Sequence, residues 1–274
     1  MKNLLTAILA LFSIGLFSCQ KEVDDIFAGN ASPTGHLVKL VSKSGSDSSV
    51  LAFGYNSSNK LISLTSNAVV SGSNISFSER AERNSAQIIQ RLIIKTDQYQ
   101  QYGIDSAITN IQYTAGRYSA KVTNLNLGGI IITDSVSLVY DASGKVIRED
   151  DFLTFTGLTE QTAKTEYTYN GNNIATIKRY SYDSSTSSFT LDETYTYDQY
   201  DDKLSPMYFG VEAFVFESPE LYSYNNPLKS SITSSGSTQN YTTSYTYNSA
   251  NKPITATSSV QPGNTTATGT YYYQ

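Results

Sequence analysis

The chain has 274 residues and a formal net charge of −5, with one Cys, one His and no Trp. An acidic chain without a basic stripe is poorly suited to binding phosphates, so we expect no nucleic-acid partner. A lone Cys has no disulfide partner, and a lone His leaves no basis for Ser-His-Asp or Cys-His catalysis or for a zinc site. The 22 Tyr, with abundant Thr, Val and Ile, favour β-strands.

Residues 1–18 have the layout of a bacterial signal peptide. Lys2 precedes an apolar run from Leu4 to Leu16, shorter than the about 20 residues of a membrane-spanning helix. Leu16-Phe17-Ser18-Cys19 resembles the lipobox, the motif at which bacterial lipoproteins are cleaved and acylated. The resemblance implies that acyl chains on Cys19 hold the protein on a membrane, since each buried CH₂ contributes about 0.8 kcal/mol. A structural Cys behind an ordinary signal peptide is the alternative.

Residues 19–35 are expected to form the lipidated cysteine and a flexible tether. Residues 20–25, Gln-Lys-Glu-Val-Asp-Asp, resemble the Lys-plus-acidic export tag of surface lipoproteins in Bacteroidota. A solvated acidic linker is the alternative interpretation. Together with Cys19, the tag predicts an outer-membrane protein, lipid-anchored and facing the cell surface. His36 follows the tether and is expected to be a surface residue.

Residues 36–274 contain a repeat with a period of about 27 residues. Each copy has alternating strand-forming residues, a break of Asn, Asp, Gly or Ser, and a second such run, which is the pattern of a β-hairpin. Eight copies predict sixteen strands, and one further strand at each end gives about eighteen. The anchor positions of the copies are 55, 83, 113, 140, 169, 197, 224 and 247.

One segment, Ser78–Lys95, fits two structures. Its Ile and Leu residues between 88 and 93 have helical spacing, which is typical of a short amphipathic helix. The repeat frame instead predicts a hairpin, and we favour the hairpin.

The repeat also predicts which face of the sheet is buried. Most copies carry a pair of aromatic or apolar residues around a small polar one, as in Tyr167-Thr168-Tyr169. Because strand side chains alternate, one face is aromatic and the other carries Thr and Ser. We expect the tyrosines to form the core, with a sugar-stacking platform as the alternative.

A meander of this many strands leaves two bare edges unless it closes on itself. The sequence therefore predicts an all-β protein, a large single-domain antiparallel meander β-barrel of about 16–18 strands. The short Asn/Gly turns are expected at one end. Longer connections at the opposite end are the expected place for a glycan or protein ligand. These connections are 43–49, 66–74, 96–105, 154–162 and 259–266.

Two resemblances follow from the repeat. Residues 140–147, Tyr-Asp-Ala-Ser-Gly-Lys-Val-Ile, resemble the YD repeat of Rhs-type proteins. The lipobox, acidic tag and Tyr-x-Tyr-[Asn/Asp] hairpins together resemble a Bacteroidota lipoprotein domain family of unknown function with a porin-like barrel fold. The second resemblance covers about residues 36–274 and implies the architecture alone, since neither group passes catalytic residues to this chain.

Carboxylates are the remaining candidates for chemistry. The densest clusters, Glu149-Asp150-Asp151 and residues 198–202, lie beside expected turns or strand ends, where solvated acids are usual. Oxygen-rich loops suit calcium, so Asp198, Asp201 and Asp202 are a candidate weak ion site. No loop for nucleotides and no cofactor site is recognisable. The sequence predicts a non-catalytic binding or scaffold protein. A carboxylate-dependent glycan hydrolase and an integral outer-membrane pore are the alternatives.

Overall fold

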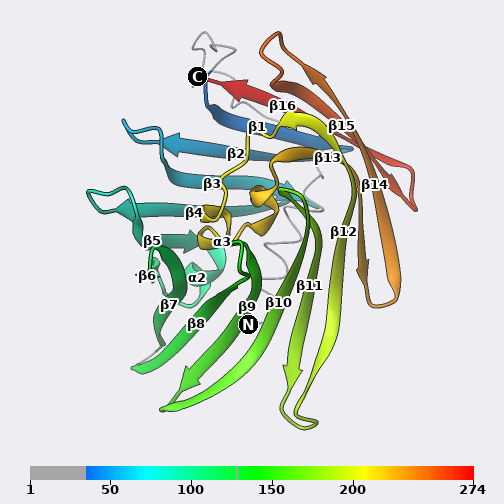
Figure 1. The fold of residues 1–274 in the computed structure, drawn as a ribbon. Coiled ribbons are helices and arrows are strands. Elements are labelled where there is room, and N and C mark those ends of the chain that lie inside the picture. The colour runs from blue at the N-terminus through cyan, green and yellow to red at the C-terminus, as the bar shows by residue number, and fades with distance from the viewer. Residues whose placement is uncertain (1–34, 128) are drawn as a thin grey trace.

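The structure is a computed structural model that describes residues 35–127 and 129–274. These residues form a closed antiparallel barrel of sixteen strands, each paired with its neighbours in sequence, with β1 paired to β16 (Figure 1). The strands are β1 (Leu37–Ser44), β2 (Asp47–Tyr55), β3 (Leu61–Val70), β4 (Ser73–Arg83), β5 (Ile89–Thr96), β6 (Ala107–Thr114), β7 (Arg117–Leu127), β8 (Ile130–Tyr140), β9 (Val146–Phe155), β10 (Leu158–Asn170), β11 (Asn173–Asp183), β12 (Ser188–Leu204), β13 (Asn225–Ser234), β14 (Ser237–Tyr247), β15 (Pro253–Gln261) and β16 (Thr265–Tyr273). The predicted fold is confirmed.

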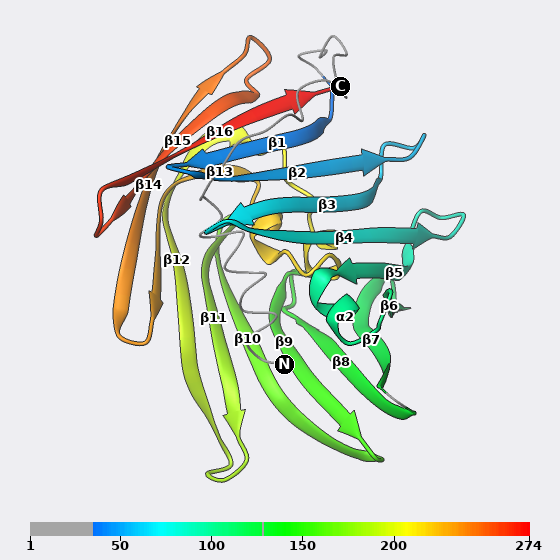
Figure 2. The same ribbon diagram turned by 180° about the vertical axis from the view of Figure 1, so that it is seen from behind.

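Three short helices lie between the strands. Helix α2 (Asp97–Gln101) connects β5 to β6, and α3 (Glu212–Val215) and the 3₁₀ helix η1 (Pro219–Tyr222) lie between β12 and β13. In the part of the chain that the structure describes, no helix has the length and hydropathy needed to cross a membrane. Figure 2 shows the barrel from behind, with β1–β5 running across the view and β9–β12 running down it.

Asn and Asp side chains build the tight turns, as their positions in the repeat predict. The Oδ1 atom of Asn56, just after β2, accepts from the backbone N–H groups of Ser58 and Lys60, each at 3.0 Å. Asn59 completes this turn with a φ of +58°, a conformation that Asn tolerates better than most residues. The same capping pattern recurs after β4, β8 and β14, at Asn84, Asp141 and Asn248.

The barrel has sixteen strands, and not the eighteen that eight hairpins and two terminal strands would give, because two of the repeat copies form a single hairpin. The copies at 197 and 224 were expected to be two hairpins, but β12 continues through the first break to Leu204. β13 then begins at Asn225, so the two copies form the two strands of one hairpin. Seven hairpins and two terminal strands therefore give sixteen.

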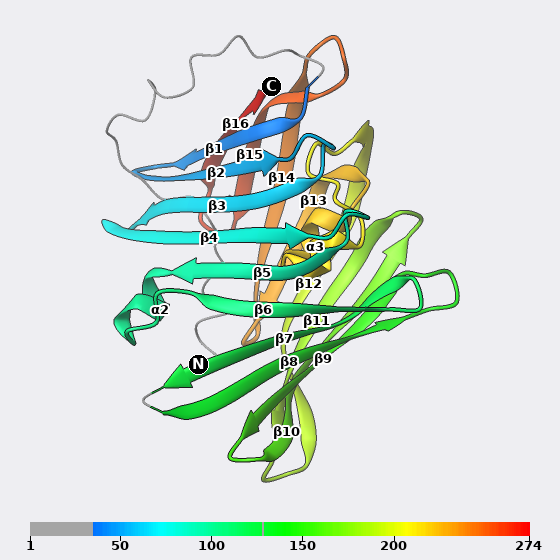
Figure 3. The same ribbon diagram turned by 90° about the vertical axis from the view of Figure 1, so that its left-hand side faces the viewer.

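The distribution of long connections also differs from the prediction. The segments that were expected to be long connections are mostly two-residue turns, as at 45–46, 71–72 and 156–157. The flanking strands continue into the residues that were expected to be loop. We call the end of the barrel that carries these turns the far end. Among the described connections at the far end, only 97–106 is long. The longest connection, 205–224, lies at the opposite end, with the Asn turns (Figure 3).

Residues 78–95 form a hairpin, as the repeat frame predicts. β4 and β5 pair in register from Phe77↔Thr96 to Arg83↔Ile89. Ile89 and Leu92 are fully buried, and the strand pattern rather than a helical one describes their exposure. The amphipathic-helix interpretation is wrong because pairing with the neighbouring strands decides the structure of so short an apolar run.

Many strands carry an interior tyrosine, and in several of them its hydroxyl bonds to the backbone. The Tyr273 hydroxyl in β16 donates to the carbonyl of Pro253, the first residue of β15, at 2.7 Å. Arg83 takes the same place in β4, where its guanidinium donates to the Leu61 carbonyl. Such bonds fasten a strand to the start of the strand before it, which explains why tyrosine rather than phenylalanine recurs. The other tyrosines that follow this rule, each with its acceptor carbonyl, are Tyr55 to Leu37, Tyr140 to Tyr118, Tyr169 to Val146, Tyr200 to Ile174 and Tyr245 to Pro227.

The connection 205–224, which we call the plug, fills part of the barrel. Its residues 213–216 are at most 1 % exposed, and 214–216 belong to the same core cluster as residues from nearly every strand. The Phe209 ring contacts Phe53 of β2, and the Phe214 ring contacts Tyr167 of β10, with centroids 5.9 and 5.0 Å apart. Contacts to strands on different sides of the barrel place the plug inside it. The lumen is thus partly filled by a segment of the chain itself.

Candidate functional site in the barrel interior

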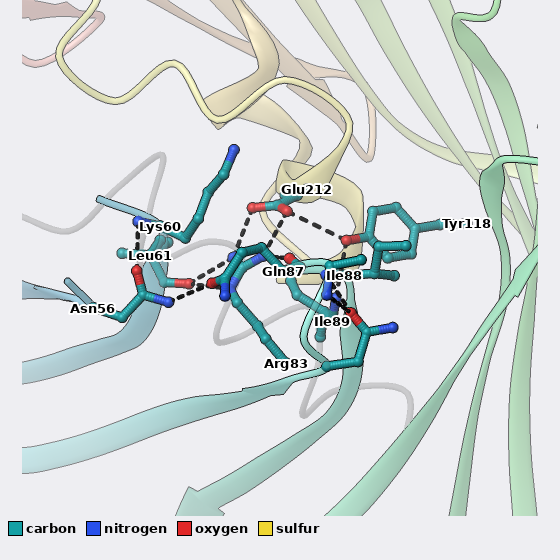
Figure 4. A network of polar contacts seen from close by, with 11 residues as sticks. Asn56, Lys60, Leu61, Arg83, Gln87, Ile88, Ile89, Tyr118 and Glu212 are labelled. Carbon is teal, nitrogen blue, oxygen red and sulfur yellow. Dashed lines mark hydrogen bonds and ion pairs between the residues drawn. The ribbon is translucent and has the colours of Figure 1, made fainter. Parts of the chain in front are cut away.

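An ion pair between Arg83 and Glu212 fixes the plug to the wall. The two guanidinium nitrogens of Arg83, at the end of β4, each donate to one Glu212 carboxylate oxygen of α3, at 2.8 Å (Figure 4). The Tyr118 hydroxyl of β7 approaches the same carboxylate from the other side, at 3.3 Å. The Arg83 side chain is only 4 % exposed, so this bidentate pair is largely removed from water. It sets the position of the first turn of α3.

Lys121 provides a second attachment in the interior. Its ammonium group donates to Glu149 of β9 at 3.1 Å and to the Phe214 carbonyl of the plug at 3.0 Å. The Tyr167 hydroxyl donates to the other Glu149 oxygen. Burial alone would lower the pKa of Lys121, but the charges of Glu149 and then Glu217 outweigh it and hold that pKa above its usual value. The lysine therefore stays charged and holds plug and wall together.

More acids than bases surround Lys121. Burial, and then the charge of Glu149, raises the pKa of Asp151 to about 7. Burial, and then the charge of Glu217, raises the pKa of Asp134 to about 6. Glu79 of β4 is 1 % exposed, and neither of its carboxyl oxygens has a hydrogen-bond partner among the described residues. Its pKa is raised well above the usual value, chiefly by burial, so we expect a neutral, protonated side chain.

A cavity of about 240 Å³ lies between the plug and the wall. Its lining combines aromatic, apolar and hydrogen-bonding side chains with one base and one acid, Arg179 of β11 and Glu220 of η1. Strands β11–β14 supply most of the wall, and the plug supplies the inner side. The aromatic members are Tyr195, Tyr197, Tyr241 and Tyr245.

The acid and the base of the cavity differ in whether their polar atoms have hydrogen-bond partners. The Arg179 Nη1 atom donates to Glu193 at 3.0 Å and to the Tyr195 hydroxyl at 2.9 Å. The Oε1 atom of Glu220 is buried and has no hydrogen-bond partner among the described residues. Burial raises the pKa of Glu220 to about 7, although Arg179 opposes the shift. A buried carboxyl oxygen without a partner beside a cavity is a group that a ligand can satisfy.

A small residue explains why the cavity exists at this place. Tyr197, Ser230 and Tyr241 pair directly across β12, β13 and β14, and all three line the cavity. In the adjacent row, Tyr195, Ile232 and Gln239 pair in the same way with a large side chain at each position, and Tyr195 and Ile232 border the cavity as well. The serine between two tyrosines leaves a gap that the plug does not fill.

The acids predicted from the sequence occupy different surroundings. The candidate ion-site residues Asp198 and Asp202 are exposed, and Asp202 pairs with Lys203 at 3.0 Å. Asp201 instead accepts from the backbone N–H and side-chain amide of Asn226, at 3.0 and 2.9 Å. The three side chains do not share one set of ligands. Among residues 35–127 and 129–274, no group of three His, Cys, Asp or Glu side chains suited to a metal ion is found.

The other predicted positions can be placed as follows. Cys19 and residues 1–34 lie outside the described residues. His36 pairs with the C-terminal residue, through N–H···O bonds with Gln274 of 2.8 and 2.9 Å, and its ring stacks on Tyr55. Glu149 and Asp151 were expected to be solvated acids beside a turn, and this is wrong. They lie within β9, where strand alternation directs both into the interior.

The interior groups that sequence reasoning missed carry weak signals. Glu79 stands between Phe77 and Ala81 in period-two alternation, which would have assigned it to the buried face. Glu220 gives no such signal, because it lies in an irregular segment whose place inside the barrel depends on distant strands.

Two solved structures are similar in fold to this chain. One is a porin-like protein from Bacteroides uniformis, with 11% identity and a TM-score of 0.54, covering 89% of this chain and 99% of that chain. The other is a porin-like protein from Bacteroides vulgatus, with 11% identity and a TM-score of 0.54, covering 88% and 99%. No family model matches the chain, and no curated protein sequence is similar to it. The chain therefore has the barrel fold of these porin-like proteins.

Proposed function

We propose that this is a lipid-anchored, outer-membrane protein facing the cell surface, whose barrel is a non-catalytic binding module with its ligand site in the cavity beside the plug. The observation that carries the proposal is the unpartnered, buried Glu220 oxygen beside that cavity. A closed barrel fastened to its own plug is a rigid frame, and rigid frames bind small ligands with little ordering cost.

The lipobox-like residues 16–19 support the anchor. The first described residues also suit a tether. The Gly35 carbonyl accepts from Lys252, in the turn between β14 and β15. The chain thus enters the barrel at the end that carries the plug. With Cys19 acylated, this end faces the membrane and the far end projects away from it.

The distribution of side chains supports a barrel that stands outside the lipid. A membrane-spanning barrel carries an outward apolar band with aromatic girdles. Here many of the tyrosines are buried in the core, and the exposed positions of β14 and β16 are mainly Ser, Thr and Asn. The plug also occupies the interior that a pore would need.

The glycan hydrolase is the second candidate, and one observation favours it. Glu149 and Asp151 face the interior together, and the pKa of Asp151 is raised to about 7, as a general acid requires. Neither residue lines the cavity, and Glu149 is held by Lys121 and Tyr167. Binding therefore ranks above hydrolysis.

The test compares the full chain with the Cys19→Ala variant in the cells that express it. We expect the full chain in the membrane fraction, labelled by an alkyne fatty acid, and the variant unlabelled and released. The purified full chain, in mild detergent, is then melted with a panel of monosaccharides, amino acids and short amines. A ligand at 100 times its Kd adds about 2.7 kcal/mol, or roughly 5–10 °C for a domain of this size.

The control is Ser18→Ala, which keeps a small residue before the cysteine and should leave anchoring unchanged. An unlabelled full chain that stays in the membrane would contradict the anchor. A melting temperature that no compound of the panel moves would contradict the binding module.

A further inference from the structure

The size of the cavity limits its occupant. The volume of the cavity is about 240 Å³. It is below the roughly 300–1,000 Å³ of sites that take drug-sized ligands. An occupant of one small ring fits this space, and an extended chain of such units does not.

The charges around the cavity favour an occupant without net charge. Arg179 is already paired with Glu193, at 3.0 Å, so this ion pair is neutral as a unit. An anionic ligand would face Glu220, and a cationic ligand would face Arg179. The raised pKa of Glu220, about 7, means that this group also carries less than a full charge near neutral pH. Burying an unpaired ionic ligand here would therefore cost free energy.

The hydrogen-bonding groups and rings favour a hydroxylated ring. The buried Glu220 Oε1 requires a donor, and a hydroxyl supplies one without adding charge. The gap over Ser230 lies between two tyrosines, Tyr197 and Tyr241, whose flat faces suit the C–H face of a saturated ring. Apolar lining residues, among them Ile177 and Leu221, would cover the rest of such a ring.

We propose that the cavity binds one neutral monosaccharide unit, with a ligand hydroxyl donating to Glu220 Oε1 and the sugar ring lying in the gap over Ser230. This inference rests on the proposed function and adds the ligand class. Neutral sugars meet the size, charge and hydrogen-bonding conditions together, whereas amino acids and amines bring charges that the cavity does not match.

The experiment is isothermal titration calorimetry on the purified full chain in mild detergent, with a panel of neutral hexoses and pentoses, amino acids and alkylamines. Ser230→Leu fills the gap from the wall, a change that cores with a cavity tolerate. We expect it to weaken sugar binding at least 100-fold. The isosteric Glu220→Gln should weaken binding about 10-fold while the fold is kept. Matched controls are Ser244→Leu, on the exposed face of β14, and Glu160→Gln, also exposed.

The outcomes separate the inference from the proposed function. Sugar binding that Ser230→Leu and Glu220→Gln weaken, and the controls do not, supports the inference. Binding of amino acids or amines in place of sugars overturns the ligand class and leaves the binding module standing. Sugar binding unchanged in both variants places the site elsewhere and overturns the inference. No heat with any compound, together with a stabilised Ser230→Leu variant, identifies a packing gap and overturns both proposals.

Discussion

Tyrosine contributes to this barrel in two ways, through its ring and through its hydroxyl group. The ring packs in the interior, and the hydroxyl reaches a backbone carbonyl near the start of the preceding strand, as Tyr55 does at 3.0 Å to Leu37. A carbonyl at a strand end has no complete ladder partner, so a buried hydroxyl beside it satisfies both groups. The recurrence of tyrosine in the repeat is thus a hydrogen-bonding requirement as well as a hydrophobic one.

Removal of one such hydroxyl tests this role. We expect Tyr273→Phe to lower the free energy of unfolding by about 1 kcal/mol, because the Pro253 carbonyl loses its donor in a buried site. This corresponds to roughly 2–4 °C in a thermal melt. The control is the neighbouring Tyr272→Phe, on the outer face, where the ring under Lys39 is kept. Equal losses in the two variants would contradict the role of the hydroxyl bond.

The hairpins could be predicted from the sequence, and the plug could not. Residue types such as Asn56 and Asp141 specify tight turns locally, within a few positions, so each break is visible in the sequence. The break at 197–202 has the same composition, yet Asp201 bonds to Asn226 of the next strand and β12 continues past it. That outcome depends on residues about 25 positions away. Local patterns carry no information about such contacts.

The plug is part of the core rather than an accessory loop. The Phe214 side chain is fully buried and contacts both Tyr167 and Tyr222. We expect Phe214→Ala to lower the free energy of unfolding of the whole barrel by about 3–5 kcal/mol, the usual cost of a large cavity. Urea denaturation followed by tyrosine fluorescence measures it.

The control for this change is Phe155→Ala, at a side chain that is 46% exposed. We expect it to cost far less, because little buried area is lost. A plug that melts separately from the barrel, seen as a second transition in the Phe214→Ala variant alone, would show that the two do not fold as one unit.

Charges in the interior make the stability of the whole molecule depend on pH in an unusual direction. The pKa values of Asp134, Asp151 and Glu220 are raised to about 6, 7 and 7. Between about pH 4 and pH 7 the folded protein therefore holds protons that the unfolded chain has released. Stability is highest at the acidic side of this window and falls as the pH rises through the folded-state pKa values. The plug, which carries Glu220, should be held less firmly at high pH.

The thermal melt should therefore move to higher temperature when the pH is lowered from 8 to 5. For Asp151 alone, a change of about two pH units below its pKa is worth on the order of 3 kcal/mol. The isosteric Asp151→Asn variant should show a flatter pH dependence, with the difference largest at pH 8. A wild-type melting temperature that rises from pH 5 to pH 8 would contradict the assignment of protonated interior acids.

The sequence gives even less indication of the proposed binding site than of the plug. Arg179 and Glu220 are 41 positions apart, in a strand and in an irregular segment, and no spacing rule connects them. The sequence did indicate a tyrosine-rich face, on which four cavity residues lie, with sugar stacking as one interpretation. It could not indicate that a single serine, Ser230, opens a gap in that face, because the gap depends on which strands pair.

The pairing of β1 with β16 has a consequence for the synthesis of the chain. His36 and Gln274 exchange two backbone hydrogen bonds, although almost the whole chain separates them. During synthesis, fifteen strands are available before the strand that closes the ring. Until then β1 and the newest strand are unpaired edges, which readily join other chains. The formation of β16 thus decides when the barrel stops being vulnerable to aggregation through β1.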